Sequence, residues 1–281
     1  YPYFVRTGGF IQKCFILPGS RITLYPQSVD RGIVTFNDNE VHEVEYVVKD
    51  IAGNASRVKL KIQSSIPKEG HPVVSPPANL LRYDRHSEFN AHNIKIIAEP
   101  YNLYDDLDLE YSTSPKRADG YSVVHHIHNR YTPIHDSLNV WVKPDVDLGE
   151  HADKAVLYSP ISSGQESEYT DGWVKAKIHA FGDFYIRIDT VPPVITPINF
   201  RNGSSMAGRK TIAFRISDSL SGVKSFVGKI DGKWVLVEHN DKSKMFIYTF
   251  DPSISRGRHT FELTATDYKN NVSQFTADFL R

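Results

Sequence analysis

Hydrophobic and polar residues alternate along most of the chain, and a period of two predicts β-strands. The clearest stretches are VEYVVKD (44–50), RVKLKIQ (57–63), NIKIIAE (93–99), WVKAKIHAF (173–181), FYIRID (184–189), TIAFRISD (211–218), MFIYTF (245–250) and TFELTATD (260–267). Many carry Val, Ile, Thr, Tyr or Phe, which suit a pleated, half-buried surface. Helical periodicity is almost absent, so the pattern predicts an all-β chain.

Turn residues separate these short strands. They are Asp-Gly at 119–120, 171–172 and 231–232, Asn-Gly at 202–203 and Pro-Gly at 18–19. Such dipeptides supply the backbone angles that tight hairpin turns require. Many short strands with regular turns are typical of β-sandwiches or barrels.

Two proline-rich segments, 66–77 and 189–197, interrupt the strands. Proline stiffens linkers and cannot donate a hydrogen bond within a central strand. We therefore expect three modules, which are 1–65 (partial or small), 66–190 (larger) and 191–281. The first is short for a sandwich, which suggests that its N-terminal strands lie upstream of Tyr1 or are missing.

An internal repeat links the first and last modules. HEVEYVVKDIAGNASRVKLKI (42–62) aligns without gaps with HTFELTATDYKNNVSQFTADF (259–279). In both copies a strand leads into D-x-x-[GN]-N-x-S and then into a second strand, which predicts a hairpin whose Asp accepts backbone N–H groups of the turn. The alternative is a calcium site at Asp50 or Asp267. Calcium takes roughly six to eight oxygens, and one carboxylate with amide neighbours supplies too few, so we predict a turn.

The stretch VVHHIHN (123–129) places three histidines within four positions. Alternate residues of a strand share a face, so His126 and His128 would point the same way. Two neighbouring imidazoles are how some zinc sites begin. The stretch runs into turn-like residues 129–133 and then into the strand 138–142, so we expect it to form one arm of a β-hairpin.

Four motifs follow one another in the last module. They are DTVPPVI (189–195), ISDSLSGVKSF (216–226), KIDGKWV (229–235) and SRGRHTFELTATDYKNNVS (255–273). In this order they resemble a bacterial immunoglobulin-like (Ig-like) repeat, which has a Pro-Pro start, a D-x-x-S-G-V turn, a D-G hairpin and a closing D-x-x-G-N-x-S. The resemblance implies tandem Ig-like or fibronectin-like β-sandwich modules.

A wider resemblance covers nearly the whole chain. It is carried by YPYFVRTGGFIQKCFILPGSRITLY (1–25), VVHHIHNRYTPIHDSLNVWVKPD (123–145) and FGDFYIRIDTVPPVI (181–195). These segments resemble the C-terminal β-region of certain Gram-negative envelope proteins with a lysostaphin-type zinc endopeptidase domain upstream. The resemblance implies an exported chain, periplasmic or associated with the outer membrane. It also implies the peptidase as a partner in cis, and an envelope protein or peptidoglycan as a further partner.

A lysostaphin-type site binds zinc through the His and Asp of H-x-x-x-D and through a His of a later H-x-H. This chain contains both strings, as His126-x-His128 and His179-x-x-x-Asp183, but in the reverse order. No glycine-rich segment resembling the peptidase fold surrounds either string. We therefore predict no catalytic, cofactor-binding or metal-binding residue in this chain, with zinc implied only for the upstream domain. The alternative is a metalloenzyme that uses these four residues.

Composition narrows the classes of function. Lys plus Arg is 33 and Asp plus Glu is 33, so the net charge is zero. A nucleic-acid-binding protein would show a basic excess. No apolar run approaches the length needed to cross a bilayer. Cys14 is the one cysteine, which excludes an intrachain disulfide, and we expect it to be a buried strand thiol.

These observations favour a non-catalytic accessory role, in which the modules space, orient or shield the upstream peptidase. The second hypothesis is a surface module that binds a glycan or another protein. It predicts an exposed aromatic platform drawn from Trp141, Trp173 and Trp234.

Overall fold

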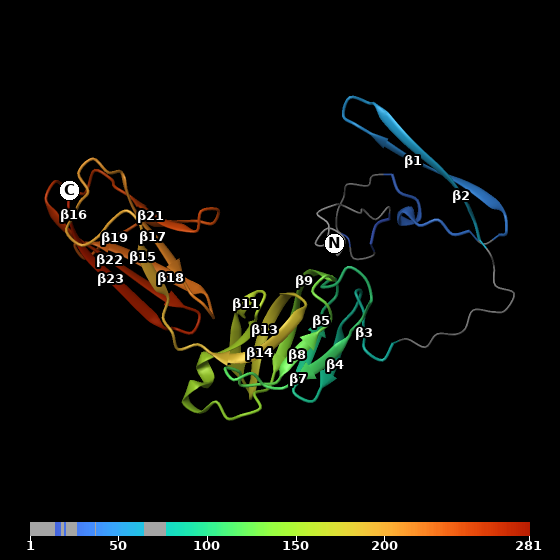
Figure 1. Ribbon diagram of the computed structural model, residues 1–281, viewed down its shortest axis with the longest axis horizontal. Coiled ribbons are helices and arrows are strands. Elements are labelled where there is room, and N and C mark those ends of the chain that lie inside the picture. The colour runs from blue at the N-terminus through green and yellow to red at the C-terminus, as the bar shows by residue number, and fades with distance from the viewer. Residues whose placement is uncertain (1–14, 18–19, 21–26, 37, 65–76) are drawn as a thin grey trace.

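The chain folds almost entirely into β-sheets (Figure 1), which confirms the predicted fold class of tandem β-sandwich modules. The computed structural model describes residues 15–17, 20, 27–36, 38–64 and 77–281. Cys14 and residues 66–76 of the first proline-rich segment lie outside these residues. Among the described residues, no helix has the length and apolar character that a membrane span needs.

The hairpin predicted for the first repeat copy is present. Strand β1 (Val41–Lys49) pairs antiparallel with β2 (Ala55–Gln63), after a short 3-10 helix, η1 (Asp30–Gly32). Asp50 accepts hydrogen bonds from the backbone N–H of Asn54 at 2.8 Å and from its side-chain amide at 2.7 Å. This is the Asx-type turn that the motif predicts.

The middle of the chain forms a sandwich of two five-stranded sheets. Its strands are β4 (Ser87–Ala91), β5 (Ile94–Ala98), β7 (Tyr111–Ser114), β8 (Val124–Ile127), β9 (Pro133–Val142), β10 (Ala155–Ser159), β11 (Ser163–Gln165), β12 (Ser167–Thr170), β13 (Trp173–Ala180) and β14 (Gly182–Ile188). One sheet has the order β11-β10-β14-β8-β7 and the other β12-β13-β9-β5-β4. A small pair, β3 (Leu80–Leu81) with β6 (Leu107–Asp108), and a 3-10 helix, η2 (Gly149–Lys154), accompany them.

The core of this middle sandwich lies between its two sheets. Ile96 and Val140 from one sheet and Leu157 and Ile186 from the other are fully buried in one hydrophobic cluster. Burying such a side chain contributes roughly 1.5–3 kcal/mol. Alternation along strands such as β9 and β13 places every second residue in the core and leaves the others on the outer face, whereas β5, β10 and β14 also bury consecutive residues.

The expected hairpin between residues 123–129 and 138–142 is wrong. β8 pairs with β7 and β14, whereas β9 pairs with β5 and β13 in the opposite sheet. The backbone leaves β8 at His128, whose φ is +49°, and the chain then crosses to the other sheet. A period of two identifies both strands, but it carries no information about the sheet that each one joins.

A second sandwich follows at the C-terminus. Its strands are β15 (Val194–Pro197), β16 (Ser204–Ser205), β17 (Thr211–Ser217), β18 (Val223–Ile230), β19 (Lys233–Val235), β20 (Val237–Asn240), β21 (Met245–Thr249), β22 (Arg258–Asp267) and β23 (Val272–Leu280). The sheets have the orders β15-β17-β21-β20 and β16-β23-β22-β18-β19. Phe214 and Phe261 stack across the core with centroids 5.1 Å apart. The hairpin predicted for the second repeat copy is confirmed as β22–β23.

The two repeat copies differ in what their apolar faces contact. Leu263 of β22 is 1% exposed in the core of the C-terminal sandwich, whereas the aligned Tyr46 of β1 is 47% exposed. An isolated two-stranded hairpin is at best marginally stable in water. The same sequence pattern thus forms a sandwich face at one end of the chain and, among the described residues, a largely exposed hairpin at the other.

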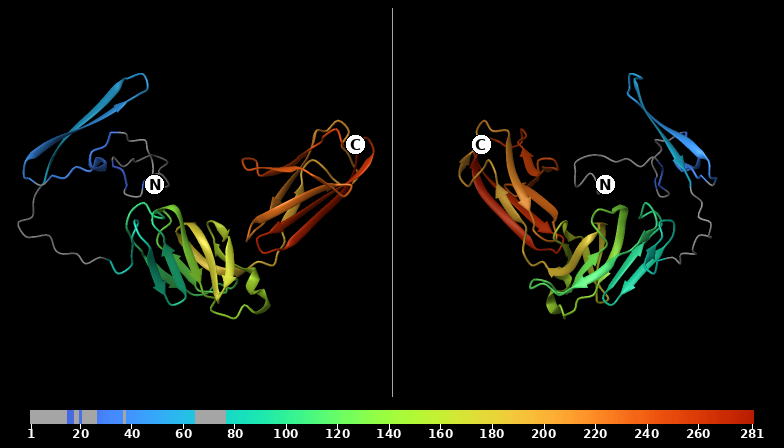
Figure 2. Two further views of the ribbon diagram at one scale, coloured as in Figure 1. Left: turned by 180° about the vertical axis from the view of Figure 1, so that it is seen from behind. Right: turned by 45° about the vertical axis from the view of Figure 1, so that its right-hand side comes forward.

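The two sandwiches meet at a hydrogen-bonded junction. Figure 2 shows them from two further sides, joined end to end at an angle. Lys154 of η2 donates to the Asn271 side-chain oxygen at 3.0 Å and to the Lys269 carbonyl. In return, Lys269 donates to the Ser167 carbonyl at 2.7 Å, and the Asn271 amide donates to the Asp189 carbonyl at 2.9 Å. The turn between β22 and β23 therefore contributes most of the hydrogen bonds by which the C-terminal sandwich docks on the middle one.

Close packing at this junction generates a prediction for Gly164 of β11. A Cβ atom built on Gly164 would overlap the backbone carbonyl of Leu220 in the C-terminal sandwich. The backbone of Leu220 cannot move aside as easily as a flexible side chain could. We therefore expect Gly164→Ala to change the angle between the two sandwiches. Small-angle X-ray scattering of the full chain should show an altered pair-distance distribution, with an unchanged circular dichroism spectrum.

Ile161→Ala is the control for this experiment, because Ile161 precedes the same strand and its side chain is exposed. It should leave the scattering curve as in the wild type. Identical curves for Gly164→Ala and the wild type would contradict the close contact.

Candidate functional site

The fold separates the members of the H-x-H string. His126 of β8 lies opposite Asp183 of β14, with Nδ1 2.6 Å from Oδ1. His128 has left the strand, and its Nε2 lies 2.9 Å from Thr132 Oγ1 while its ring packs edge-on against Phe181. The expectation that His126 and His128 share a strand face fails because the strand ends at Ile127.

The H-x-x-x-D string is also divided. His179 lies next to the last residue of β13 in one sheet, and its Nδ1 lies 2.9 Å from the Asp136 carbonyl oxygen. Asp183 belongs to β14 in the other sheet, because the backbone turns at Gly182. Within the described residues, no group of three or more potential metal ligands includes a histidine.

His126 takes part in a hydrogen-bonded row across three neighbouring strands. Its Nε2 lies 2.9 Å from Ser114 Oγ of β7, and its Nδ1 faces Asp183. The order Ser–His–Asp is that of a hydrolytic triad. However, the Asp183 and His126 side chains are 51% and 35% exposed on the outer face of the sheet. Water weakens their electrostatic interaction there, and we interpret the row as a cross-strand polar ladder.

His125 points the other way, into the middle sandwich. It is 1% exposed, and its Nδ1 lies 2.8 Å from the Tyr111 hydroxyl. Its Nε2 is buried and has no hydrogen-bond partner in the described part of the chain. Burial lowers the pKa of His125 to about 4, against an opposing effect of Asp145. His125 is therefore a neutral structural side chain.

A second candidate surface is the outer face of the sheet that contains β9 and β13. Trp141 and Trp173 lie there edge to face, with ring centroids 6.4 Å apart. Lysine ammonium groups cover the rings: Lys175 lies 4.6 Å and Lys95 5.3 Å from the Trp141 centroid, and Lys143 lies 4.7 Å from that of Trp173. These are cation–π distances.

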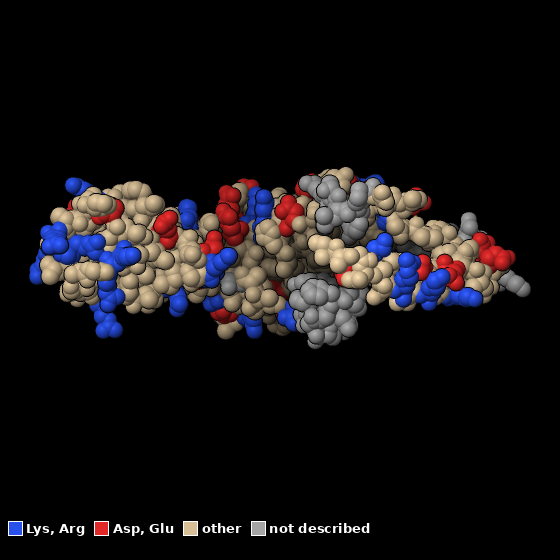
Figure 3. All heavy atoms as spheres, turned by 90° about the horizontal axis from the view of Figure 1, so that it is seen from above, with Lys and Arg blue, Asp and Glu red and all other residues tan. Residues whose placement is uncertain are grey.

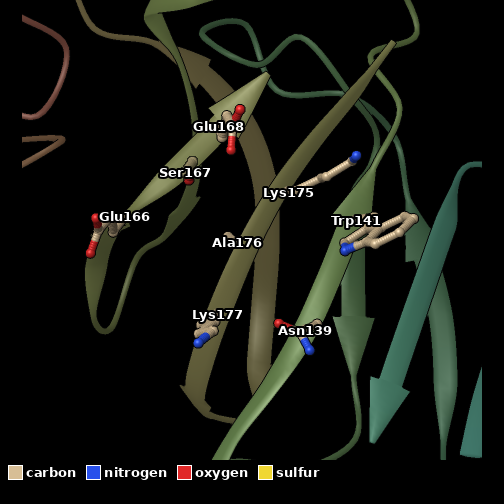
Figure 4. A pocket seen from close by; sticks show the side chains of 8 residues that line it. All are labelled: Asn139, Trp141, Glu166, Ser167, Glu168, Lys175, Ala176 and Lys177. Atoms are coloured by element: carbon tan, nitrogen blue, oxygen red, sulfur yellow. The ribbon is translucent and has the colours of Figure 1, made fainter. Parts of the chain in front are cut away.

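A shallow pocket opens beside Trp141 (Figure 4). Its lining combines an aromatic ring, an amide and charges of both signs, a set that can stack on a ligand and hydrogen-bond to it. Trp234 is 66% exposed but lies on β19 of the other sandwich. Trp141 and Trp173 are half-buried beneath lysine side chains, so the exposed platform that the binding hypothesis predicts is present only in part. The lining residues are Asn139, Trp141, Glu166, Ser167, Glu168, Lys175, Ala176 and Lys177.

A third cluster lies at the junction and was missed by sequence reasoning. One carboxylate oxygen from each of Asp189, Asp218 and Asp267 lies within 4.8 Å of the others. Asp189 begins the linker after β14, Asp218 follows β17, and Asp267 ends β22. Asp189 and Asp267 are fully buried. Each aspartate stands in one of the motifs that resemble an Ig-like repeat, which is the signal that was available.

Charge is distributed without a continuous basic stripe on the face shown in Figure 3. Acidic and basic side chains mix over the middle sandwich, and basic side chains gather toward the free end of the C-terminal one.

One family comparison overlaps the middle sandwich. Residues 78–189 match the Zu5-like domain family model. The match ends at Asp189, where the linker to the C-terminal sandwich begins, and it spans less than half of the chain. It supports an Ig-like β-sandwich for this part of the chain. No curated protein sequence matches.

Two solved structures show remote likenesses. Fibronectin(III)-like modules of CbhA from Clostridium thermocellum are 14% identical, with a TM-score of 0.27 over 51% of this chain and 84% of theirs. Dimeric latent PorU from Porphyromonas gingivalis is 13% identical, with a TM-score of 0.26 over 52% of this chain and 21% of its own. Such TM-scores carry no argument, so the fold assignment rests on the sheets of this chain.

In this chain, the buried neutral His125 predicts a specific pH dependence of stability. Between the folded pKa of about 4 and the unfolded value near 6.5, the unfolded state binds more protons, so stability falls as the pH falls. The loss should approach roughly 1.4 kcal/mol per pH unit within this window. Urea unfolding of the wild type and of His125→Leu from pH 7 to pH 4 measures it, and the variant should have the shallower slope.

The exposed His92 provides the control, since His92→Leu should keep the wild-type slope. Equal slopes for His125→Leu and the wild type would show that His125 is not buried in the neutral form.

Proposed function

We propose that this chain is the non-catalytic accessory region of an exported cell-envelope protein, attached to an upstream zinc endopeptidase that acts on peptidoglycan. Its modules, which we place at 1–65, 66–190 and 191–281, space and orient that peptidase. The periplasm or the outer membrane is the proposed location. The parentage rests on the resemblance of the sequence, and the role as a spacer rests on the junction between the sandwiches.

The junction is the observation that carries the spacer role. Lys154, Lys269 and Asn271 exchange hydrogen bonds across it, and Lys269 and Asn271 are buried. Hydrogen bonds to charged groups contribute roughly 1.5–3 kcal/mol each, and a buried group that loses its partner is costly. The junction therefore resists hinge motion, as a spacer requires, whereas sandwiches joined only by a flexible linker would reorient freely.

Removal of the Asn271 side chain tests this role. Asn271→Ala deletes the amide that donates to the Asp189 carbonyl and the oxygen that accepts from Lys154. We expect the distance distribution between spin labels on the two sandwiches, at Thr113→Cys and Asp241→Cys, to broaden. Double electron–electron resonance on the full chain, with Cys14→Ser, measures it.

Asn54→Ala is the matched control. Asn54 occupies the same turn position in the first repeat copy and makes the same two bonds to its aspartate, but it is exposed. It should leave the distribution narrow. A broad distribution in the wild type would remove the support for a spacer.

The sequence of the gene upstream of the codon for Tyr1 tests the proposed link to a zinc endopeptidase. Residues encoded before Tyr1 should contain a signal peptide and then H-x-x-x-D followed by H-x-H. Other sequence there would overturn the peptidase assignment without affecting the spin-label result.

The tryptophan face favours a second candidate function, the binding of glycan. Trp141 and Trp173 lie on an outer sheet face beside a pocket with amide and charged groups. We expect Trp141→Ala to weaken binding of the chain to insoluble peptidoglycan about tenfold, since an aromatic contact contributes on the order of 1 kcal/mol or more. A pull-down with increasing peptidoglycan measures it.

Trp234→Ala serves as the comparison, because it removes an exposed tryptophan far from the pocket. It should bind as the wild type does. Failure of the wild type to sediment with peptidoglycan would eliminate this second function.

A further inference from the structure

The three aspartates at the junction are held in place by backbone N–H groups. Asp189 accepts from the N–H of Ser221 at 2.9 Å, and Asp218 accepts from the N–H of Gly222 at 2.7 Å. Asp267 accepts from two N–H groups of its own turn, each at 2.8 Å. The three carboxylates are therefore fixed close together before any ligand arrives, although their residues come from three separate segments.

No positive side chain of the described residues forms an ion pair with this cluster, although the charges of Asp189 and Asp267 act on the buried ammonium group of Lys269 and oppose the lowering of its pKa by burial. Among the described residues, no Lys, Arg or His nitrogen lies within 4.0 Å of the three carboxylates. The two junction lysines, Lys154 and Lys269, donate instead to carbonyl and amide oxygens. Burial raises the pKa of Asp218, and the charges of Asp189 and Asp267 act in the same direction. Buried carboxylates at this spacing need a cation or a proton.

A buried hydroxyl group at the same place is a second, independent observation. Ser221 is 5% exposed, and its backbone is anchored on the Asp189 carboxylate. Its Oγ is buried and has no hydrogen-bond partner in the part of the chain that the structure describes. Buried hydroxyl groups normally have a partner, so this oxygen is available as a ligand beside the carboxylates.

The chemistry of the available atoms selects the ion. All are oxygens, without the imidazole or thiolate groups that zinc prefers. Mg²⁺ requires near-ideal octahedral geometry at about 2.0–2.1 Å, whereas Ca²⁺ accepts roughly six to eight oxygens in flexible arrangements at about 2.3–2.6 Å. Three carboxylates and a hydroxyl group from three segments of the chain, with the half-buried Asp218 accessible to water, suit calcium.

We propose that Asp189, Asp218 and Asp267 bind one calcium ion, with Ser221 Oγ as a further ligand, and that the ion stiffens the junction between the two sandwiches. The ion would add a cofactor to a chain for which the sequence predicted none. The stiffening role rests on the proposed spacer function, whereas the binding site does not.

Calorimetric titration of the full chain with CaCl₂, after dialysis against EGTA, tests the site. We expect saturable binding of one calcium ion, a higher melting temperature with calcium, and a much smaller effect of MgCl₂. Asp218→Asn should lower the calcium affinity at least tenfold, and Ser221→Ala should lower it severalfold while preserving the fold. Absence of binding by the wild type up to about 5 mM calcium would overturn the site.

Asp50→Asn is the matched control, because Asp50 occupies the position of Asp267 in the first repeat copy and belongs to no such cluster among the residues that the structure describes. Its calcium affinity should equal that of the wild type. The distances between spin labels on the two sandwiches distinguish the calcium-binding site from the proposed stiffening of the junction. Calcium should narrow their distribution, and binding without narrowing would overturn the stiffening while leaving the site intact.

Discussion

The turn between β22 and β23 makes most of the hydrogen bonds that join the two sandwiches. In this turn, Asp267 accepts hydrogen bonds from the backbone N–H groups of Lys269 and Asn271, and these bonds fix the position of the Asn271 side chain. Because that side chain is fixed, its amide group can donate hydrogen bonds both to the Asp267 carboxylate and to the Asp189 carbonyl oxygen of the linker. The first repeat copy makes the same turn at Asp50, but there the turn is exposed. One local motif thus serves as an ordinary hairpin turn in one place and as a docking element in another.

The backbone conformation at the strand ends determines where the side chains of the H-x-H and H-x-x-x-D strings lie. β8 ends before His128, where φ is positive, and the chain changes sheet at Gly182 before Asp183. The sequence spacings of these residues match those of a zinc site, but the folded chain places their side chains on different faces or in different sheets. The one pair that does meet, His126 with Asp183, does so because β8 and β14 are neighbours in a sheet.

A stiff arm and a binding face are compatible in one molecule. The tryptophan face lies on the outer side of the middle sandwich, whereas the junction lies at the end that meets the C-terminal sandwich. A rigid junction would hold that face at a constant angle to the C-terminal sandwich. If calcium occupies the junction, the ionic conditions around the protein would then influence the geometry of the arm, because a bound ion stabilises the arrangement that binds it.

Features that depend only on neighbouring residues could be predicted from the amino-acid sequence. Alternation placed most strands, turn dipeptides marked their ends, and the repeat predicted both hairpins, since strand period and turn chemistry are local. It did not show that β8 and β9 join opposite sheets, or that Asp189, Asp218 and Asp267 meet. Asp267 alone offered too few oxygens for calcium, and the missing carboxylates come from segments far away in the chain. Only tertiary packing brings such residues together, because it depends on how whole sheets bury their apolar faces and not on the order of residues within a strand.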